Sequence, residues 1–306
     1  MPINSQDNSQ ETQLVSIVIP TFNHAHYLGR ALASVSDQTY EKWEAIVVDN
    51  HSTDNTEEIV ASFSDPRIVL LKTHNNGVIA VSRNMGIRAA KGAWIAFLDS
   101  DDWWTPNKLK VCMEYARPST DLIYHDLAIS YDRSSLFDKQ TISSWQVRRP
   151  IVKDLLLRGN AIATSSVVVK KQLLEQINGM NVDPNMIAAE DYNTWLRIAE
   201  ITDGFKYIPR NLGFYRQHGN GMSQKDMSEP AEFACRAFTH LLNKKQRLKF
   251  ESNIRYAGGR FSFQKGNYLE ARKDLLFCLR YGNFAISLKS LFMLLLGGIL
   301  IYQRGR

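Results

Sequence analysis

Four short apolar runs alternate with helical patterns over the first hundred residues, and this alternation limits the folds open to the chain. The runs fall at 15–19, 45–48, 68–71 and 93–98. Between them, apolar residues recur at helical spacing at 26–36, 55–63 and 78–90. Strands that alternate with helices form a parallel sheet covered by helices. We therefore predict an α/β fold built on an open parallel sheet.

The last of these runs ends in a dense acidic motif. Asp99, Asp101 and Asp102 follow it within four residues. Ligands of open α/β sheets bind at the carboxyl edge of the strands, where this motif would lie. Carboxylate oxygens suit Mg²⁺ or Mn²⁺, and these ions in turn hold phosphates. An acidic surface turn is the alternative, but it fits poorly between an apolar run and a tryptophan pair. The motif therefore predicts a site for a metal ion and a diphosphate.

Charge is distributed unevenly along the 306 residues, whose net charge is +6. Residues 244–306 hold thirteen of the 37 Lys and Arg but three of the 31 Asp and Glu. The basic surplus thus lies away from the acidic motif, which argues against a nucleic-acid partner and favours an anionic membrane surface. Three widely spaced cysteines form no metal-binding pattern and indicate a reducing compartment. Residues 1–13 are polar, lack the apolar core of a signal peptide, and predict a flexible tail.

Five short motifs follow one another in an order that is characteristic of a known enzyme family. They are Val-Ser-Ile-Val-Ile-Pro-Thr-Phe-Asn at 15–23, Val-Val-Asp-Asn-His-Ser-Thr-Asp at 47–54, Asn-Gly-Val and Ser-Arg-Asn-Met-Gly-Ile at 76–78 and 82–87, Asp-Ser-Asp-Asp at 99–102, and Glu-Asp at 190–191. Over about residues 14–220 the chain resembles the family 2 glycosyltransferases. The resemblance implies the GT-A fold, a Rossmann-like fold of nucleotide-diphospho-sugar transferases. His51 departs from the pattern, because the family often has glycine there and histidine tolerates a positive φ less well.

The resemblance also implies a binding site for the sugar donor. The residues implied are Thr21, Asn23, Asp49, Arg83, Asp99 and Glu190. A carboxylate at Asp49 can accept the imide N–H of uracil or thymine, which would select a UDP- or TDP-sugar. Glu190 would contact the donor sugar or orient its neighbour. Structural alternatives are a helix cap at 21–23, an ordinary turn at Asp49 and a solvated arginine at Arg83.

The resemblance places Mn²⁺ or Mg²⁺ on Asp101 and Asp99, with His218 as a further ligand or else a structural histidine. Asp191 is the candidate general base. It starts a predicted helix at 190–200, whose dipole favours the anion and would keep the carboxylate ionised at neutral pH. Such a base takes the proton of an acceptor hydroxyl as that oxygen attacks the anomeric carbon, which inverts the configuration. The alternative is a pair of acids that only stabilises the helix start.

The C-terminal part lies outside the resemblance. Residues 256–282 predict a helical hairpin, and residues 291–302 form an apolar run flanked by basic residues. Twelve residues are too few to span a bilayer, so we predict a helix in the membrane interface. A core helix or a dimer contact is the alternative. The predicted organisation is a tail (1–13), a GT-A domain (14–225) and a basic helical region (226–306).

We therefore expect an inverting, metal-dependent glycosyltransferase of bacterial surface-polysaccharide synthesis. Its partners would be a nucleotide-diphospho-sugar donor, a glycan or lipid-linked acceptor and the cytoplasmic membrane surface, to which it would attach peripherally. Two rivals are a nucleotidyltransferase of similar fold and a non-catalytic sugar-binding protein. The first should have a Gly-rich, basic loop after the first strand, and residues 20–24 contain none. The sequence does not identify the sugar, because its specificity would depend on the irregular stretch 133–185.

Overall fold

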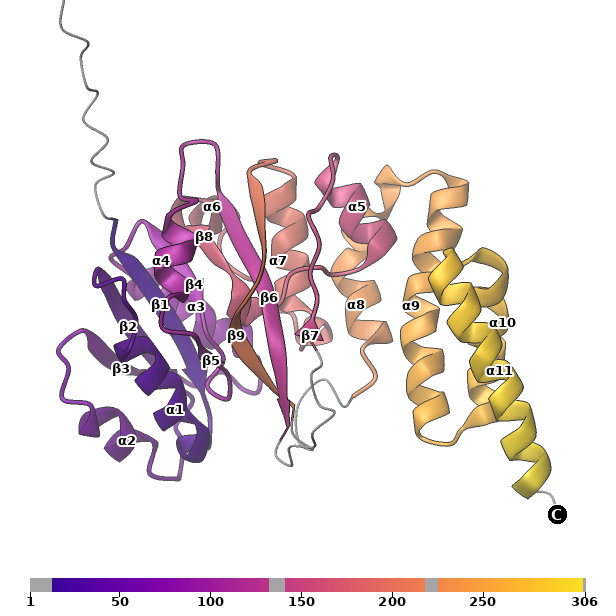
Figure 1. The fold of residues 1–306 in the computed structure, drawn as a ribbon, viewed down its shortest axis with the longest axis horizontal. Helices are drawn as coiled ribbons and strands as arrows, with labels where there is room; N and C mark the ends of the chain where they lie inside the picture. Colours follow the sequence, from indigo (N-terminus) through magenta and orange to yellow (C-terminus); the bar gives the residue numbers. More distant parts are fainter. Residues whose placement is uncertain (1–12, 132–140, 218–224, 305–306) are drawn as a thin grey trace, which may run out of the picture.

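The computed structural model describes residues 13–131, 141–217 and 225–304, whose strands form one mixed sheet (Figure 1). The strand order is β3-β2-β1-β4-β8-β6-β9-β5, and β7 pairs with β6. The parallel part consists of β1 (Val15–Thr21), β2 (Trp43–Asp49), β3 (Ile68–Lys72) and β4 (Trp94–Phe97). The remaining strands are β5 (Trp103–Trp104), β6 (Leu122–Tyr131), β7 (Thr141–Ile142), β8 (Val168–Lys170) and β9 (Phe205–Gln217).

The predicted alternation of strands and helices is confirmed. The helices α1 (Ala25–Ser36), α2 (Thr56–Ser62) and α3 (Ile79–Ala89) connect β1 to β4 in chain order. Strand β1 pairs with β2 on one side and with β4 on the other. The strand order therefore proceeds from β1 to β2 and β3 on one side and continues with β4 on the other side. At such a topological switch point a crevice forms at the carboxyl ends of the strands.

Both faces of the sheet are covered by helices. Successive residues of a strand point to opposite sides of the sheet, so neighbours in one strand pack into different clusters. Val18 belongs to one buried cluster, and its neighbours Ile17 and Ile19 belong to the other. Helices α1 and α4 (Lys108–Met113) contribute to the cluster around Ile17. The helices α3, α5 (Ile151–Arg158), α6 (Lys171–Gln176) and α7 (Glu190–Ala199) contribute to the cluster around Val18. Two packed layers of helices thus fix the sheet edge that carries the polar motifs.

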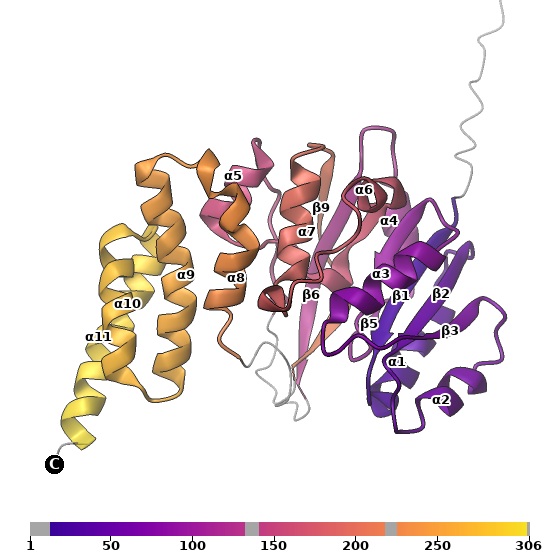
Figure 2. The ribbon, with the colours of Figure 1, turned by 180° about the vertical axis from the view of Figure 1, so that it is seen from behind.

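The C-terminal helices form a layer of their own. They are α8 (Ser228–Cys235), α9 (Lys244–Gln264), α10 (Tyr268–Tyr281) and α11 (Phe284–Arg304). Figures 1 and 2 show α9, α10 and α11 side by side at the end of the molecule farthest from β3. The predicted hairpin is confirmed: α9 and α10 meet at a turn in which Gly266 has φ +80°. A positive φ suits glycine, since it has no Cβ to collide with the backbone.

The predicted extent of the apolar C-terminal helix is wrong. Helix α11 begins at Phe284 rather than at 291, because Asn283 accepts the backbone N–H of Ile286 at 2.9 Å and so caps the helix start. The stretch Phe284–Ile301 is long and apolar enough to cross a membrane, and 17% of it is buried. By length and composition, α11 is therefore not too short to span a bilayer, contrary to the expectation from the sequence.

Two local details of the structure were not evident from the sequence. Asp102 is buried, and one of its carboxylate oxygens accepts the backbone N–H of Arg216 at 2.9 Å, which ties the acidic motif to β9. Strand β8 begins at Val168, because Thr164–Ser166 form a 3₁₀ turn called η1. Most of the tail (residues 1–12) and part of the irregular stretch (132–140) lie outside the described residues.

Candidate active site

The carboxyl ends of β1 and β4 open into a cavity of about 610 Å³. Six of the predicted donor-binding, metal-binding and catalytic residues line it, and they come from four separate segments. They are Thr21 from β1, Arg83 from α3, Asp99 and Asp101 after β4, and Glu190 and Asp191 from α7. The fold therefore brings together motifs that are up to 170 residues apart in the chain.

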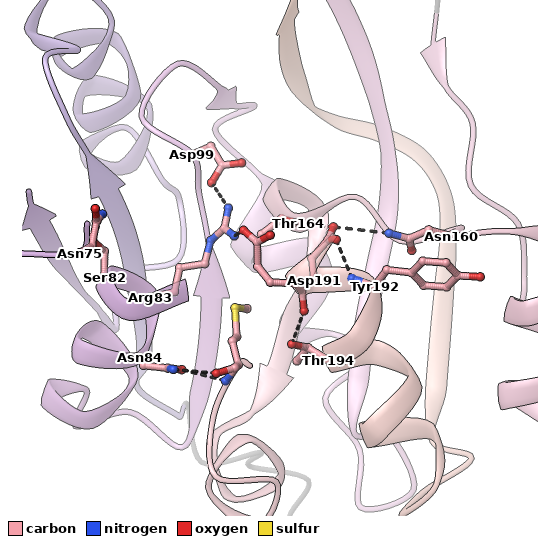
Figure 3. A network of polar contacts seen from close by, with 12 residues as sticks. Asn75, Ser82, Arg83, Asn84, Asp99, Asn160, Thr164, Asp191, Tyr192 and Thr194 are labelled. Atoms are coloured by element: carbon pink, nitrogen blue, oxygen red, sulfur yellow. Dashed lines mark hydrogen bonds and ion pairs between the residues drawn. The ribbon is translucent and has the colours of Figure 1, made fainter. Parts of the chain in front are cut away.

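Arg83 joins the two acidic segments (Figure 3). Its guanidinium lies 2.7 Å from the carboxylate of Asp99 and 2.9 Å from that of Glu190. Arg83 and Glu190 are both buried, so this pair is shielded from water. The two carboxylates raise the pKa of Arg83 against the lowering effect of burial, and the arginine stays charged. Arg83 is thus not the solvated arginine of the alternative reading, and it links the acidic loop to the start of α7.

Asp191 is held by three hydrogen-bond donors. Its Oδ2 accepts the hydroxyl of Thr164 at 2.9 Å and the amide of Asn160 at 3.4 Å. Its Oδ1 accepts the backbone N–H of Tyr192 at 2.6 Å. Burial and the charge of Glu190 raise the pKa of Asp191 to about 6, against the lowering effects of Arg83 and of the hydrogen bonds. The helix start therefore does not hold this pKa low, as the sequence suggested, but the carboxylate is still largely ionised at pH 7.

The acidic loop is anchored from several directions. The side chains of Ser100 and Asp102 are buried, while Asp99 and Asp101 are half-buried beside the cavity. The hydroxyl of Ser100 lies 2.9 Å from Nδ1 of His24, which also lines the cavity. Burial and the charges of Asp101 and Asp99 raise the pKa of Asp102 well above its usual range. Asp102 therefore anchors the loop through its bond to Arg216, and all three acids line the cavity.

Asn23 and Asp49 do not line the cavity; they fasten two neighbouring turns. Asp49 is buried and accepts hydrogen bonds from the backbone N–H and hydroxyl of Ser52. Asn23 accepts the N–H of Thr53 at 2.8 Å. His51 has φ +54°, so the expected left-handed turn is present without glycine, and its ring stacks on His74 at 3.8 Å. The contact between Asp49 and a base stays a prediction, because this carboxylate is buried and bonded to Ser52.

Two of the three predicted metal ligands, Asp99 and Asp101, lie in the described part of the chain. His218 lies outside the described residues, so its predicted role stays a prediction. Within residues 13–131, 141–217 and 225–304, no group of three or more His, Cys, Asp or Glu side chains is arranged to hold a metal. A magnesium-type ion in an enzyme commonly uses one or two carboxylates and takes its other ligands from phosphates and water. Asp99 and Asp101 fit that smaller set.

Several cavity residues were missed from the sequence. Asn50 and Asn75 follow β2 and β3, and the Asn50 side chain accepts the backbone N–H of Asn75 at 2.8 Å. Their position at strand ends was a usable signal. Thr164 and Ser165 also line the cavity, but they lie in an irregular segment with no motif to mark them. Only the three-dimensional packing identifies them.

A cavity at the switch point of the sheet, lined by acids beside a buried arginine, is typical of ligand-binding α/β enzymes. The glycosyl transferase family 2 profile matches residues 16–169. The chain belongs to this family, and it is a glycosyltransferase of the GT-A fold. It is 33% identical to the Escherichia coli UDP-Glc:α-D-GlcNAc-diphosphoundecaprenol β-1,3-glucosyltransferase WfgD, over 60% of this chain and 69% of that one. It is 31% identical to the Bacillus subtilis putative teichuronic acid biosynthesis glycosyltransferase TuaG, over 69% and 81%.

Solved structures agree on the fold. TarS from S. aureus, in complex with UDP-GlcNAc, superposes with a TM-score of 0.63 at 17% identity, covering 88% of this chain and 80% of that one. The mannosyltransferase PcManGT from Pyrobaculum calidifontis, in complex with GDP-Man and Mn²⁺, gives 0.60 at 18% identity, covering 94% and 80%. Because the chain belongs to the glycosyl transferase family 2, the nucleotidyltransferase alternative is rejected.

Proposed function

We propose that this enzyme transfers a sugar from a UDP-sugar, or a TDP-sugar, to a lipid-linked saccharide during the synthesis of a bacterial surface polysaccharide. The observation that carries the proposal is the single cavity shared by Thr21, Asp99, Asp101 and Asp191. Relatives named for UDP-glucose donors and diphosphoundecaprenol acceptors support the two substrate classes.

In this mechanism Asp191 is the general base. The acceptor hydroxyl attacks the anomeric carbon, its proton passes to Asp191, and the bond to the diphosphate breaks with its electron pair leaving on UDP. A single displacement of this kind inverts the anomeric configuration. With a pKa of about 6, Asp191 is ionised at neutral pH. This pKa is also close to neutral pH, which makes the carboxylate an effective base.

The donor would be held by atoms that the protein leaves available. Within the described chain, the hydroxyl of Thr21 and Oε2 of Glu190 are buried without a hydrogen-bond partner, and both residues line the cavity. Buried polar atoms are normally paired, so each is suited to a hydroxyl or amide of a ligand. Asp49 and Asn23 would support the base-binding turns, and Arg83 would set the positions of Asp99 and Glu190.

Asp99 and Asp101 would hold Mn²⁺ or Mg²⁺, and the family resemblance adds His218 as a further ligand. A bound divalent ion neutralises negative charge on the departing diphosphate. Asp101 and Asp99 both line the cavity, and Asp99 also forms an ion pair with Arg83. The acidic loop thus suits an ion that is shared with the donor.

The C-terminal helices would attach the enzyme to the cytoplasmic face of the membrane. Exposed apolar side chains follow one another along α11, namely Phe284, Leu288, Leu291, Phe292, Leu295 and Ile299. An apolar groove of about 520 Å³ lies between this helix and Tyr256 on α9. Exposed Lys289, Arg272 and Arg280 add positive charge to the same layer. Apolar surface flanked by basic residues suits an anionic leaflet, where a lipid-linked acceptor resides.

A thermal-shift panel tests the donor assignment. We would heat the purified protein with UDP, TDP, GDP, CMP and NAD, each with and without Mn²⁺. Binding at a hundredfold excess over Kd stabilises the folded state by about 2.7 kcal/mol, which such an assay detects. We expect stabilisation by UDP or TDP that requires Mn²⁺. Stabilisation by GDP alone would overturn the choice of base, and no response to any nucleotide would favour a non-catalytic protein on this fold.

A further inference from the structure

The 3₁₀ turn η1 contacts both halves of the active site through adjacent residues. The hydroxyl of Thr164 donates to Oδ2 of Asp191 at 2.9 Å. The hydroxyl oxygen of Ser165 accepts the backbone N–H of Asp99 at 3.1 Å, and its carbonyl accepts the indole N–H of Trp104 at 2.8 Å. Thr164 and Ser165 are both buried and both line the cavity. One short segment is thus bonded to the base on one side and to the acidic loop on the other.

The turn is itself fixed to the sheet. Its end continues into β8, which pairs with β4, and the backbone N–H of Phe97 donates to the carbonyl of Val167. Asn160 gives a second point of support, because its side-chain oxygen accepts the N–H of Ile162 at 3.0 Å. That bond orients the Asn160 amide so that its NH₂ group points toward Asp191 (Figure 3). The contacts to Asp191 therefore come from a segment that is itself hydrogen-bonded, at its end to the sheet and at Asn160 to Ile162.

We propose that Thr164 and Ser165 are positioning residues: Thr164 fixes the carboxylate of the base, and Ser165 fixes the loop that holds the donor. Together they set the separation between the proton acceptor and the diphosphate. The proposal rests on the proposed function, since it gives Asp191 and Asp99 their roles. A group misplaced by about 1 Å can lose two orders of magnitude in rate, which makes such a support effective.

The hydroxyl of Thr164 also affects the protonation of the base. It donates to the ionised form of Asp191 and so lowers the pKa of this carboxyl. Burial and the charge of Glu190 outweigh that effect, and the resulting pKa is about 6. The charged groups facing Asp191 are Glu190 on its own helix and Arg83 on α3, whereas Thr164 and Asn160 are neutral. Removal of the hydroxyl should therefore move the Asp191 pKa upward while the surrounding charges stay the same.

Three variants test the two roles separately. Thr164→Val keeps the shape of the side chain but removes the hydroxyl, Thr164→Ser restores the hydroxyl, and Ser165→Ala removes the other contact. The readouts are the pH profile of kcat/KM, the Kd of UDP with Mn²⁺, and the Asp191 pKa from NMR of ¹³C-labelled carboxyl groups. The last two need no turnover, so they report on the positioning roles even if transfer itself is absent.

We expect Thr164→Val to move the acid limb and the NMR pKa upward by about one pH unit, because a hydrogen bond to a charged group has about that strength. Its Kd for UDP should stay within about twofold, and Thr164→Ser should recover the wild-type limb. Ser165→Ala should weaken UDP binding and leave the Asp191 pKa unchanged. An unchanged pKa in Thr164→Val, or a Thr164→Ser variant as impaired as Thr164→Val, would overturn the proposal. If Thr164→Val does not fold, Asn160→Ala takes its place with the same expected direction. Absence of transfer in the wild type, with the pKa changes intact, would instead reject the proposed function.

Discussion

Replacement of Asp191 by asparagine should strongly reduce transfer and at the same time stabilise the fold. The wild-type pKa of about 6 means that the folded protein disfavours the charged carboxylate. The rise from 3.8 to about 6 corresponds to about 3 kcal/mol at pH values above both. Water reaches the half-buried side chain, and asparagine cannot accept hydrogen bonds at both of its ends. We therefore expect a net gain of about 1–2 kcal/mol at pH 8.

The pH dependence of this gain follows from the same shift. In the wild type the penalty is complete above about pH 6 and disappears as the pH falls toward 3.8, since the folded protein then takes up a proton more readily than the unfolded chain. The Asp191→Asn variant lacks the penalty at every pH. Its advantage in unfolding free energy should thus be present at pH 8 and nearly absent at pH 4.5.

The assay is urea unfolding of both proteins at pH 8 and pH 4.5, together with transfer and UDP-binding measurements. Transfer should fall by about two to four orders of magnitude, which is the usual contribution of a general base, while the Kd of UDP stays near wild type. Glu200→Gln, an exposed acid at the other end of α7, is the matched control and should change neither property. A variant that is less stable than the wild type at pH 8, or a gain that is equal at both pH values, would refute the reasoning.

Three further predictions concern other parts of the molecule. Asp101→Ala should lose the Mn²⁺-dependent part of UDP binding in calorimetry; unchanged dependence on Mn²⁺ would remove Asp101 as a ligand. Arg83→Met leaves two acids without their partner and should lower the free energy of unfolding by about 3 kcal/mol, whereas exposed Arg88→Met on the same helix should have little effect. The double change Phe292→Asp with Leu295→Asp should reduce sedimentation with anionic vesicles and preserve UDP binding. Wild-type protein that ignores such vesicles would contradict the membrane assignment, and resistance of bound protein to a carbonate wash would show insertion instead of peripheral attachment.

The parallel half of the sheet could be predicted because its signals are local. Each strand from β1 to β4 is a short apolar run, and the first three are each followed by a helix with apolar residues at helical spacing. Register and burial then follow from the alternation of side chains. The antiparallel half was harder, because β5 and β7 are two residues long and β9 pairs with β6 across about eighty residues.

The candidate site was predictable where a motif marked it and not elsewhere. The acids after β4 and at the start of α7 have characteristic neighbours in the sequence, but their link through Arg83 is a tertiary contact. Thr164 has no such marker, and the direction of the Asp191 pKa depends on burial that a helix start does not reveal. The predicted length of α11 was too short for a different reason. The uninterrupted apolar run starts at residue 291, whereas the helix starts at the cap formed by Asn283.

The most direct test of the central claim is the release of UDP from a panel of UDP-sugars in the presence of a synthetic lipid-diphospho-saccharide acceptor and Mn²⁺, with wild-type enzyme and Asp191→Asn side by side. We predict acceptor-dependent release of UDP by the wild type with at least one donor, and almost none by the variant, although both bind UDP. Release by Asp191→Asn at the wild-type rate would contradict the account, because the proton of the acceptor would then be taken by another group.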